Sequence, residues 1–258
     1  MEFMHMLMNT LQFEKVNSFR PIAGMITFLL LLCMQIASGK VGYVIAGMIP
    51  YQSLDTFDSF ARISIHHTVQ LLIGLAAILV LSKRMHVNFH FGLGDKKVGI
   101  KILAIFTTIF TVISVLQHAQ MAMNNQLPVY NFPLNARNML GSLGFQLFLS
   151  GPTEEVVYRA LPVILLPYAF GRSVKIKGCI TLEVVMSSVL FTLAHIRWSL
   201  VPFTIEADYF QIMYAFVVGT VQGIAYQRSR SILYPVLMHS FSNVLMVGGG
   251  YAFTVLVS

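Results

Sequence analysis

The feature of this sequence that most constrains its fold is a succession of long apolar runs separated by short segments that carry most of the charge. Hydrophobic residues make up 56% of the chain and charged residues only 10%, whereas soluble domains carry about 25% charged residues. An apolar run of about 20 residues crosses the hydrocarbon core as a helix. The alternating pattern of a membrane β-barrel is absent. We therefore predict an all-α, polytopic membrane helix bundle.

The apolar runs predict about seven transmembrane helices, and the 258 residues allow six to eight. A further patch, Val41–Tyr51, is too short to span alone, and Gln117–Arg137 has the composition of a loop. The seven runs are Pro21–Gly39, Ile63–Leu81, Val98–Leu116, Met139–Phe170, Cys179–Ile196, Tyr209–Tyr226 and Ile232–Val257.

The distribution of basic residues gives an orientation. With seven spans and the N-terminus inside, twelve of the 17 Lys and Arg residues fall on the inner side and four on the outer side. The inner ones are Lys15, Arg20, Lys83, Arg84, Lys96, Lys97, Lys101, Arg172, Lys175, Lys177, Arg228 and Arg230, and the outer ones Lys40, Arg62, Arg137 and Arg197. Cytoplasmic loops carry an excess of Lys and Arg, so we expect the N-terminus in the cytoplasm. Because the net charge of +7 is scattered among these loops, we predict no nucleic-acid partner.

A cluster of charges interrupts the fourth run. The stretch Ser150–Arg159 contains two adjacent carboxylates, Glu154 and Glu155, and an arginine inside otherwise apolar sequence. A charge at membrane depth costs roughly 2.5–3.5 kcal/mol on insertion scales, so such a cluster is a candidate functional site. The alternative is a structural ion-pair network that locks helices together.

The fourth run is too long for one straight span, at about 48 Å for its 32 residues. Gly151-Pro152 offers a break, since proline removes a backbone donor and suits the first turn of a helix. Ser150 or Thr153 would then cap a new helix whose positive N-terminal end favours the two glutamates. Glu155 and Arg159 are four residues apart and can pair, which leaves Glu154 free for chemistry.

Partners for these charges occur in two later runs. Phe191 and His195 are four residues apart in the fifth run, and His239 and Asn243 are four apart in the seventh. Buried polar groups need partners, so we expect these side chains to converge with Glu154 on one wet cavity. Straight helices would hold His195 and His239 at different depths. We therefore expect that the fifth span extends past Arg197 towards Pro202, that the seventh begins in a wet vestibule before Ile232, or that the orientation is the reverse.

Together these residues resemble the three motifs of the CAAX prenyl endopeptidase and bacteriocin-processing (CPBP, or Abi) family of intramembrane proteases. The motifs are Glu-Glu-x-x-x-Arg, Phe-x-x-x-His and His-x-x-x-Asn, and Gly219 and Gly223 resemble the small-residue stretch before the last one. The resemblance covers about 139–245. It implies a variable transmembrane part (21–137) and a catalytic transmembrane core (138–258). Residues 1–20, which are rich in Met and Phe and carry Lys15 and Arg20, are predicted to form an N-terminal interfacial segment.

The resemblance also implies an endopeptidase that cleaves a membrane-associated peptide or protein without a covalent intermediate. Glu154 and His195 would activate a water molecule, and His239 and Asn243 would stabilise the oxyanion. Glu155, Arg159 and Phe191 would support them. The family covers prenylated CAAX proteins, bacteriocin leaders and pheromone precursors. The short chain favours a protein of the bacterial plasma membrane with a peptide or membrane-protein substrate.

Three alternatives remain at this point. Glu and His also bind zinc, but we predict no metal because Asn243 suits an oxyanion hole better than a zinc shell. A non-catalytic immunity or scaffold protein would keep the fold, although no motif position is lost. A proton-coupled transporter would show broken helices in both halves, and only one break is predicted.

The remaining polar residues are predicted to be peripheral. Glu183 is expected to snorkel or pair at the inner interface near Lys175–Lys177. His66 and His67 are expected at an interface, and His118 in solvent.

Overall fold

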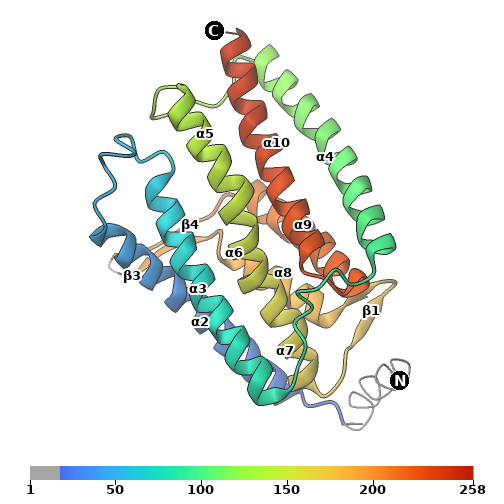
Figure 1. Cartoon of the computed structure of the whole chain (residues 1–258). Helices are drawn as coiled ribbons and strands as arrows, with labels where there is room; N and C mark the ends of the chain where they lie inside the picture. Colours follow the sequence, from blue (N-terminus) through green and yellow to red (C-terminus); the bar gives the residue numbers. More distant parts are fainter. Residues whose placement is uncertain (1–17, 201, 258) are drawn as a thin grey trace.

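The computed structural model of the chain describes residues 18–200 and 202–257. The predicted interfacial segment 1–20 therefore lies almost entirely outside the described residues. Within the described part, the chain forms a bundle of seven helices when the uninterrupted helical run 136–170 is taken as one (Figure 1). Besides this run they are α2 (Pro21–Met48), α3 (Ala61–Met85), α4 (Lys96–Met123), α8 (Leu182–Leu193), α9 (Tyr209–Ser229) and α10 (Leu233–Val257).

Four of these helices, α2, α3, α4 and α10, are long and apolar enough to cross a membrane. The predicted membrane helix bundle is thus confirmed in its class, while the number of spans stays a prediction. Helix α2 unites the first run with the patch Val41–Tyr51 as far as Met48. It passes close to α3 at Gly42, where a Cβ would lie 2.6 Å from a ring carbon of His66. The predicted loop 117–137 begins later, because α4 continues to Met123.

The run 136–170 contains two π-helical segments and no break. It comprises α5 (Ala136–Phe145), η1 (Gln146–Ser150), α6 (Gly151–Glu155), η2 (Val156–Ala160) and α7 (Leu161–Phe170). Each π segment ends two residues before a proline, at Pro152 and Pro162. A wider π turn accommodates a proline, which lacks an N–H and crowds the preceding turn.

The predicted helix break at Gly151-Pro152 is therefore wrong. Ser150 has helical backbone angles and makes no capping hydrogen bond, so the glutamates do not lie at a free helix N-terminus. Gly151 instead allows close packing against α10, where a Cβ would lie 2.3 Å from Ser240 Oγ. Glu154 lies about 24 Å along the helix from its end at Phe170, near the middle of the run.

Side chains of neighbouring helices satisfy carbonyls in the second π segment. Gln35 of α2 donates to Val157 O at 3.4 Å, and Ser187 of α8 donates to Tyr158 O at 2.6 Å. A buried carbonyl without a partner would cost free energy. These contacts therefore fix η2 between α2 and α8, and all of its residues 156–160 are buried.

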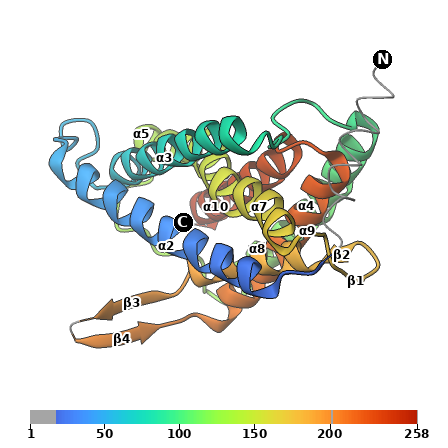
Figure 2. The same ribbon diagram turned by 90° about the horizontal axis from the view of Figure 1, so that it is seen from below.

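Two short antiparallel hairpins interrupt the otherwise helical chain. β1 (Lys175–Lys177) pairs with β2 (Ile180–Thr181), and β3 (Arg197–Leu200) pairs with β4 (Phe203–Glu206). The β3–β4 hairpin projects away from the helices (Figure 2). It begins two residues after His195, so α8 is shorter than the predicted run Cys179–Ile196.

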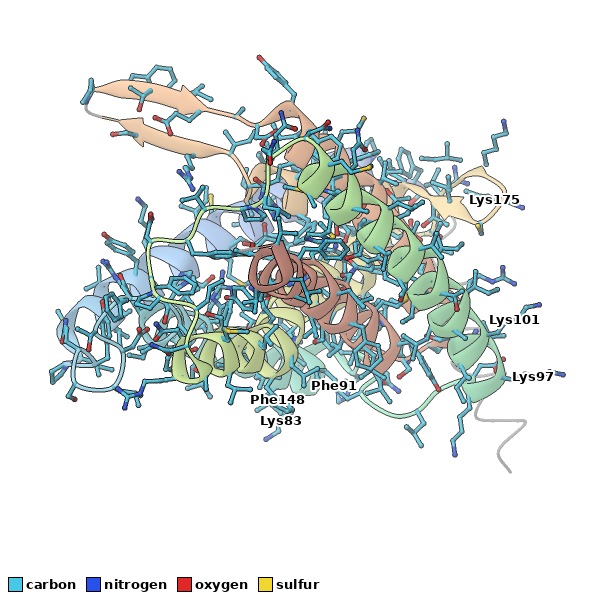
Figure 3. The ribbon with its side chains drawn as sticks, turned by 90° about the horizontal axis from the view of Figure 1, so that it is seen from above. Lys83, Phe91, Lys97, Lys101, Phe148 and Lys175 are labelled. Atoms are coloured by element: carbon cyan, nitrogen blue, oxygen red, sulfur yellow. The ribbon has the colours of Figure 1, made fainter. Side chains whose placement is uncertain are left out.

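The loops assigned to the inner side lie together at one end of the bundle. The loop after α3 contacts the end of α9, since Asp95 N donates to Ser229 O at 2.7 Å. The start of α2 meets the end of α7 through Arg20 N and Phe170 O at 2.9 Å. Exposed lysines point outward from this part of the molecule, including those labelled in Figure 3. This grouping is the one that the positive-inside pattern requires.

Two peripheral predictions are wrong. Glu183 is buried and accepts hydrogen bonds from Ser173 and from Gln227 at 2.7 Å, rather than pairing with a lysine of the β1 strand. His118 is also buried, with its ring stacked on Phe253 of α10. Both residues lie between helices, and the sequence pattern alone does not predict how deeply a polar residue is buried.

Candidate functional site

Glu154 lies at the middle of the run 136–170, between the two π segments, and its carboxylate has three neighbours. Oε1 lies 3.3 Å from His67 Nε2 and accepts a hydrogen bond from Ser150 Oγ at 3.2 Å. Oε2 lies 3.6 Å from His239 Nε2. These contacts are consistent with the prediction that Arg159 does not bind Glu154. The Glu154 carboxylate nevertheless has partners, because two imidazoles flank it.

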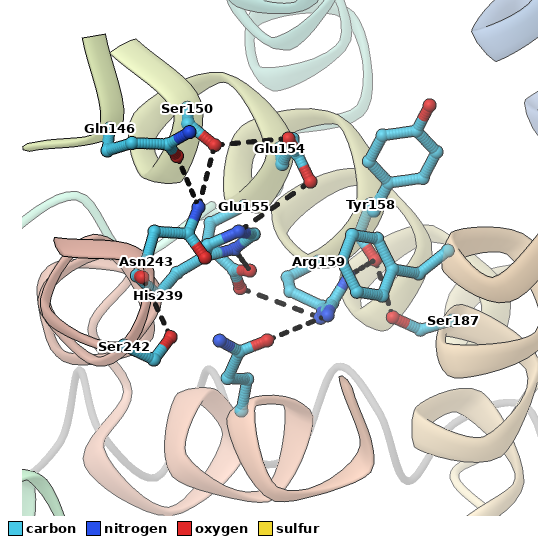
Figure 4. A network of polar contacts seen from close by, with 12 residues as sticks. Gln146, Ser150, Glu154, Glu155, Tyr158, Arg159, Ser187, His239, Ser242 and Asn243 are labelled. Carbon is cyan, nitrogen blue, oxygen red and sulfur yellow. Dashed lines mark hydrogen bonds and ion pairs between the residues drawn. The ribbon is translucent and has the colours of Figure 1, made fainter. Parts of the chain in front are cut away.

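Glu155 and Arg159 form the predicted i,i+4 ion pair. Arg159 Nε lies 3.5 Å from Glu155 Oε2, and both side chains are wholly buried. The guanidinium also donates to Gln222 Oε1 of α9 at 2.8 Å and lies 4.1 Å from the centre of the Phe191 ring. The arginine thereby links α8 and α9 to the run 136–170 (Figure 4).

The small residue Gly219 makes room for this arginine. A Cβ there would lie 3.0 Å from Arg159 Nη2 and 3.3 Å from the ring of Phe191. Gly223, one turn later, packs against Val184 of α8, where a Cβ would lie 3.0 Å from a methyl carbon. Gly219 and Gly223 therefore allow α9 to pack closely against Arg159 and against Val184 of α8.

His239 of α10 connects the two glutamates. Its Nδ1 lies 2.8 Å from Glu155 Oε1, and its Nε2 faces Glu154 (Figure 4). A carboxylate only accepts hydrogen bonds, so Nδ1 carries a hydrogen. Such a contact sets the orientation of the imidazole and leaves Nε2 for the site.

His195 follows α8 and is oriented in the same way. Its Nδ1 donates to Phe191 O at 2.9 Å, because a backbone carbonyl accepts. Its ring lies 4.7 Å from that of Phe191, whose ring centre is 5.9 Å from that of His239. The expected extension of the fifth span past Arg197 is wrong, because α8 ends at Leu193, yet both histidine rings pack on one phenylalanine.

Asn243 lies one turn after His239 and faces the first π segment. Its Nδ2 donates to Gln146 Oε1 at 2.8 Å and to Ser150 Oγ at 3.0 Å. Ser150 in turn donates to Glu154. A continuous hydrogen-bonded path thus runs from Asn243 to the Glu154 carboxylate, as Figure 4 shows.

These side chains surround one cavity of about 310 Å³. This volume is at the lower end of the range of about 300–1,000 Å³ that is usual for ligand sites. Glu154, His195, His239 and Asn243 all line it, as predicted. The remaining lining residues come from α3, α5, η1, α8, α9 and α10: Ile63, His67, Phe145, Gln146, Ser150, Phe191, Gln211, Tyr214, Ala215, Val218, Gln222, Ser242, Met246 and Val247.

Sequence reasoning missed several polar members of this cavity, and three of them belong to the hydrogen-bonded network around Glu154. His67 was expected at an interface, yet it is 8% exposed and reaches Glu154. Gln146 and Ser150 were not assigned to the site. A helix-period pattern could have found the last two, since Ser150 and Glu154 are four residues apart. No local signal points from α3 to Glu154, because the contact spans 87 positions of sequence.

Zinc in proteins is held by grouped side chains of Cys, His, Asp or Glu. Among residues 18–200 and 202–257, no three His, Cys, Asp or Glu side chains are grouped so that they could hold a metal ion. By this criterion the described side chains do not form the three-ligand site that catalytic zinc requires.

Comparisons with known proteins agree with the motifs. A family model described as type II CAAX prenyl endopeptidase, Rce1-like, matches residues 136–245. This segment begins at the first residue of α5 and ends two residues beyond Asn243. A search of curated proteins and a search of solved structures gave no match. The family resemblance inferred from the three motifs is thus confirmed.

Proposed function

Residues 136–245 belong to the Rce1-like family of type II CAAX prenyl endopeptidases, and on this premise we propose that the chain is an intramembrane endopeptidase in which Glu154 activates the hydrolytic water. At family level the chain is a membrane protease of the CAAX type. The observation that supports the specific proposal is the position of Glu154. Its carboxylate lines the cavity and is flanked by the Nε2 atoms of two histidines.

In the proposed reaction, the Glu154 carboxylate removes a proton from water. The resulting hydroxide attacks the carbonyl carbon of the scissile peptide bond, and the carbonyl oxygen becomes an oxyanion. Glu154 then passes the proton to the leaving nitrogen as the C–N bond breaks, giving a carboxylate product and an amine. General base catalysis of this kind contributes typically 10²–10⁴-fold.

We assign His195 to the water and His239 with Asn243 to the oxyanion. His195 has its Nδ1 committed to Phe191 O, so its Nε2 is available to the cavity. His239 donates through Nε2 when that atom is protonated, since Nδ1 is bound to Glu155. Both amide hydrogens of Asn243 are engaged by Gln146 and Ser150. Binding of a substrate carbonyl must therefore displace one of these contacts.

The proposed substrate is a peptide bond of a membrane-associated peptide or protein. Four helices that are long and apolar enough to cross a membrane support this proposal. The matched family's name refers to CAAX proteins, while leader or pheromone peptides remain candidates from the motif resemblance. We further propose that the N-terminus is cytoplasmic, since the basic loops share one end of the bundle.

The test uses purified protein in liposomes with two internally quenched probes, a farnesylated peptide ending in a CAAX sequence and its unprenylated twin. Comparative proteomics of membrane peptides from cells that express wild-type protein or Glu154→Gln identifies the natural substrate. Wild-type-dependent cleavage that Glu154→Gln abolishes supports the proposal. Cleavage that persists undiminished in Glu154→Gln overturns it.

We propose that the reaction needs no metal, and zinc is the competing version. Chelation with EDTA or phenanthroline, together with metal analysis of the active protein, separates the two. Full activity of metal-free protein contradicts the zinc version. If the metal-free protein loses activity and zinc alone restores it, our proposal of a metal-free reaction is contradicted.

A further inference from the structure

We propose that His67, on α3 and outside the matched segment 136–245, is a positioning residue that holds Glu154 as an oriented carboxylate. This inference rests on the proposed role of Glu154 and deepens it. It assigns part of the site to a helix that the three motifs do not include.

The contacts of His67 require one proton between it and Glu154. Nδ1 lies 3.1 Å from Ile63 O, a carbonyl that only accepts, so Nδ1 carries a hydrogen. Nε2 lies 3.3 Å from Glu154 Oε1. Without a proton on either atom, two lone pairs would face each other across that distance. One proton therefore lies between Nε2 and Oε1.

The same contact decides how the carboxylate is presented. Oε1 is occupied by His67 and by the hydroxyl of Ser150. Oε2 faces His239 across 3.6 Å, longer than a hydrogen bond. When the shared proton resides on the imidazole, Glu154 remains ionised and Oε2 is the oxygen that accepts a proton from water.

The position of His67 is itself fixed by its neighbours. Thr153, adjacent to Glu154, donates to His67 O at 3.1 Å and ties α3 to α6. The His67 ring packs edge-on against the Phe145 ring, with 4.8 Å between the ring centres. The ring is thus held by α3, α5 and α6 at once.

The preceding residue, His66, provides a matched control. Its Nε2 lies 3.1 Å from Gly39 O of α2, and it does not line the cavity. The His66 ring packs edge-on against the His67 ring, with 5.0 Å between ring centres. His66→Asn therefore removes a packing neighbour of His67 but none of the polar contacts of His67 with Ile63 or Glu154.

Two substitutions of His67 separate a role on Glu154 from a role in packing. Glutamine places an amide donor near the position of Nε2 and can keep the contact with Glu154. Asparagine places its donor near the position of Nδ1, so it can keep the contact with Ile63 O and loses Glu154. A packing role through Ile63 predicts that asparagine is the better substitute, and our proposal predicts the reverse.

The first readout is the infrared spectrum of protein in liposomes, which needs no substrate. The band of Glu154 is identified by the difference between wild type and Glu154→Gln. We expect an ionised carboxylate in wild type, His67→Gln and His66→Asn, and a protonated carboxyl in His67→Asn. An ionised Glu154 in folded His67→Asn overturns the proposal. If His67→Asn does not fold, a protonated Glu154 in folded His67→Gln overturns it instead.

The second readout is cleavage of the two quenched peptides. A hydrogen bond to a charged group is worth about 1.5–3 kcal/mol, so we expect His67→Asn to lower kcat roughly ten- to hundredfold with KM unchanged. The kcat values of His67→Gln and His66→Asn should stay within about threefold of the wild-type value. Equal loss in the glutamine and asparagine variants contradicts the proposal. Full activity of Glu154→Gln would refute the proposed function, whereas the infrared result tests His67 independently.

Discussion

Arg159 Nε lies 3.5 Å from Glu155 Oε2, and neither side chain is reached by solvent. Replacing one partner of a buried pair leaves an uncompensated charge, which costs about 3–5 kcal/mol. We therefore expect Arg159→Ala to lower the free energy of unfolding by about that amount, measured by thermal unfolding in detergent. The partly exposed pair of Arg62 and Asp58, also 3.5 Å apart, is the control, and Arg62→Ala, which also loses a contact with the Tyr43 ring, should cost only about 0–1 kcal/mol. Equal effects of both substitutions would contradict this account of the buried pair.

Gly219 and Gly223 offer a matched pair on one face of α9. A methyl group at 219 meets Arg159 and Phe191, which contact the site, whereas the nearest atoms to one at 223 are those of Val184. Both alanine variants should lose about 1–3 kcal/mol of stability through overpacking. Cleavage per folded molecule should fall only in Gly219→Ala. Equal activities of the two folded variants would show that the position of Arg159 does not matter for the reaction.

Asp55, in the loop between α2 and α3, gives a prediction on pH. Its burial would raise the pKa, but hydrogen bonds from the backbone N–H groups of Ala61, Phe60 and Ser59 outweigh burial and lower the pKa. A carboxyl whose pKa is lower in the folded protein stabilises it above the unfolded pKa, and this stability is lost as pH falls through the folded pKa. Asp55→Asn should flatten the decrease in unfolding temperature on acidification from neutral pH. An unchanged acid dependence would contradict this assignment.

Asn243 is predicted to act on the reaction rather than on the fold. One oxyanion donor is worth about 2.7–4 kcal/mol, or roughly 10²–10³-fold in kcat. We expect that loss in Asn243→Ala, with a smaller loss in Ser150→Ala, because Ser150 orients the Asn243 amide and the Glu154 carboxylate without donating to the oxyanion. Steady-state kinetics on the cleaved probe measure both. An Asn243→Ala enzyme with wild-type kcat would remove Asn243 from the oxyanion site.

The bundle class and the set of motif residues could be predicted from sequence, because both depend on local pattern. Apolar runs identify α2, α3, α4 and α10, and i,i+4 spacing identifies the pair of Glu155 and Arg159. The convergence of His195, His239 and Asn243 on Glu154 followed from the need of buried polar groups for partners. These inferences use spacing and composition alone.

The continuity of the run 136–170 and the role of α3 could not be predicted in this way. From the sequence, Gly151-Pro152 predicts a helix break. In the structure the preceding π turn accommodates the proline, and the close approach of α10 explains the glycine. His67 reads as interfacial because two histidines follow Arg62 near the start of an apolar run. Its depth is set by packing against α5 and α6, which depends on tertiary contacts distant in sequence.

The most direct test of the central claim is the cleavage rate of Glu154→Gln beside Glu155→Gln in liposomes, each compared per folded molecule. Glutamine at 154 cannot accept the proton of water, so kcat should fall at least about 10²-fold while the protein stays folded. Glutamine at 155 weakens the ion pair with Arg159 and the contact that orients His239, so we expect a loss of stability together with a smaller loss of kcat than in Glu154→Gln. A folded Glu154→Gln protein that cleaves the probe at the wild-type rate would contradict the account.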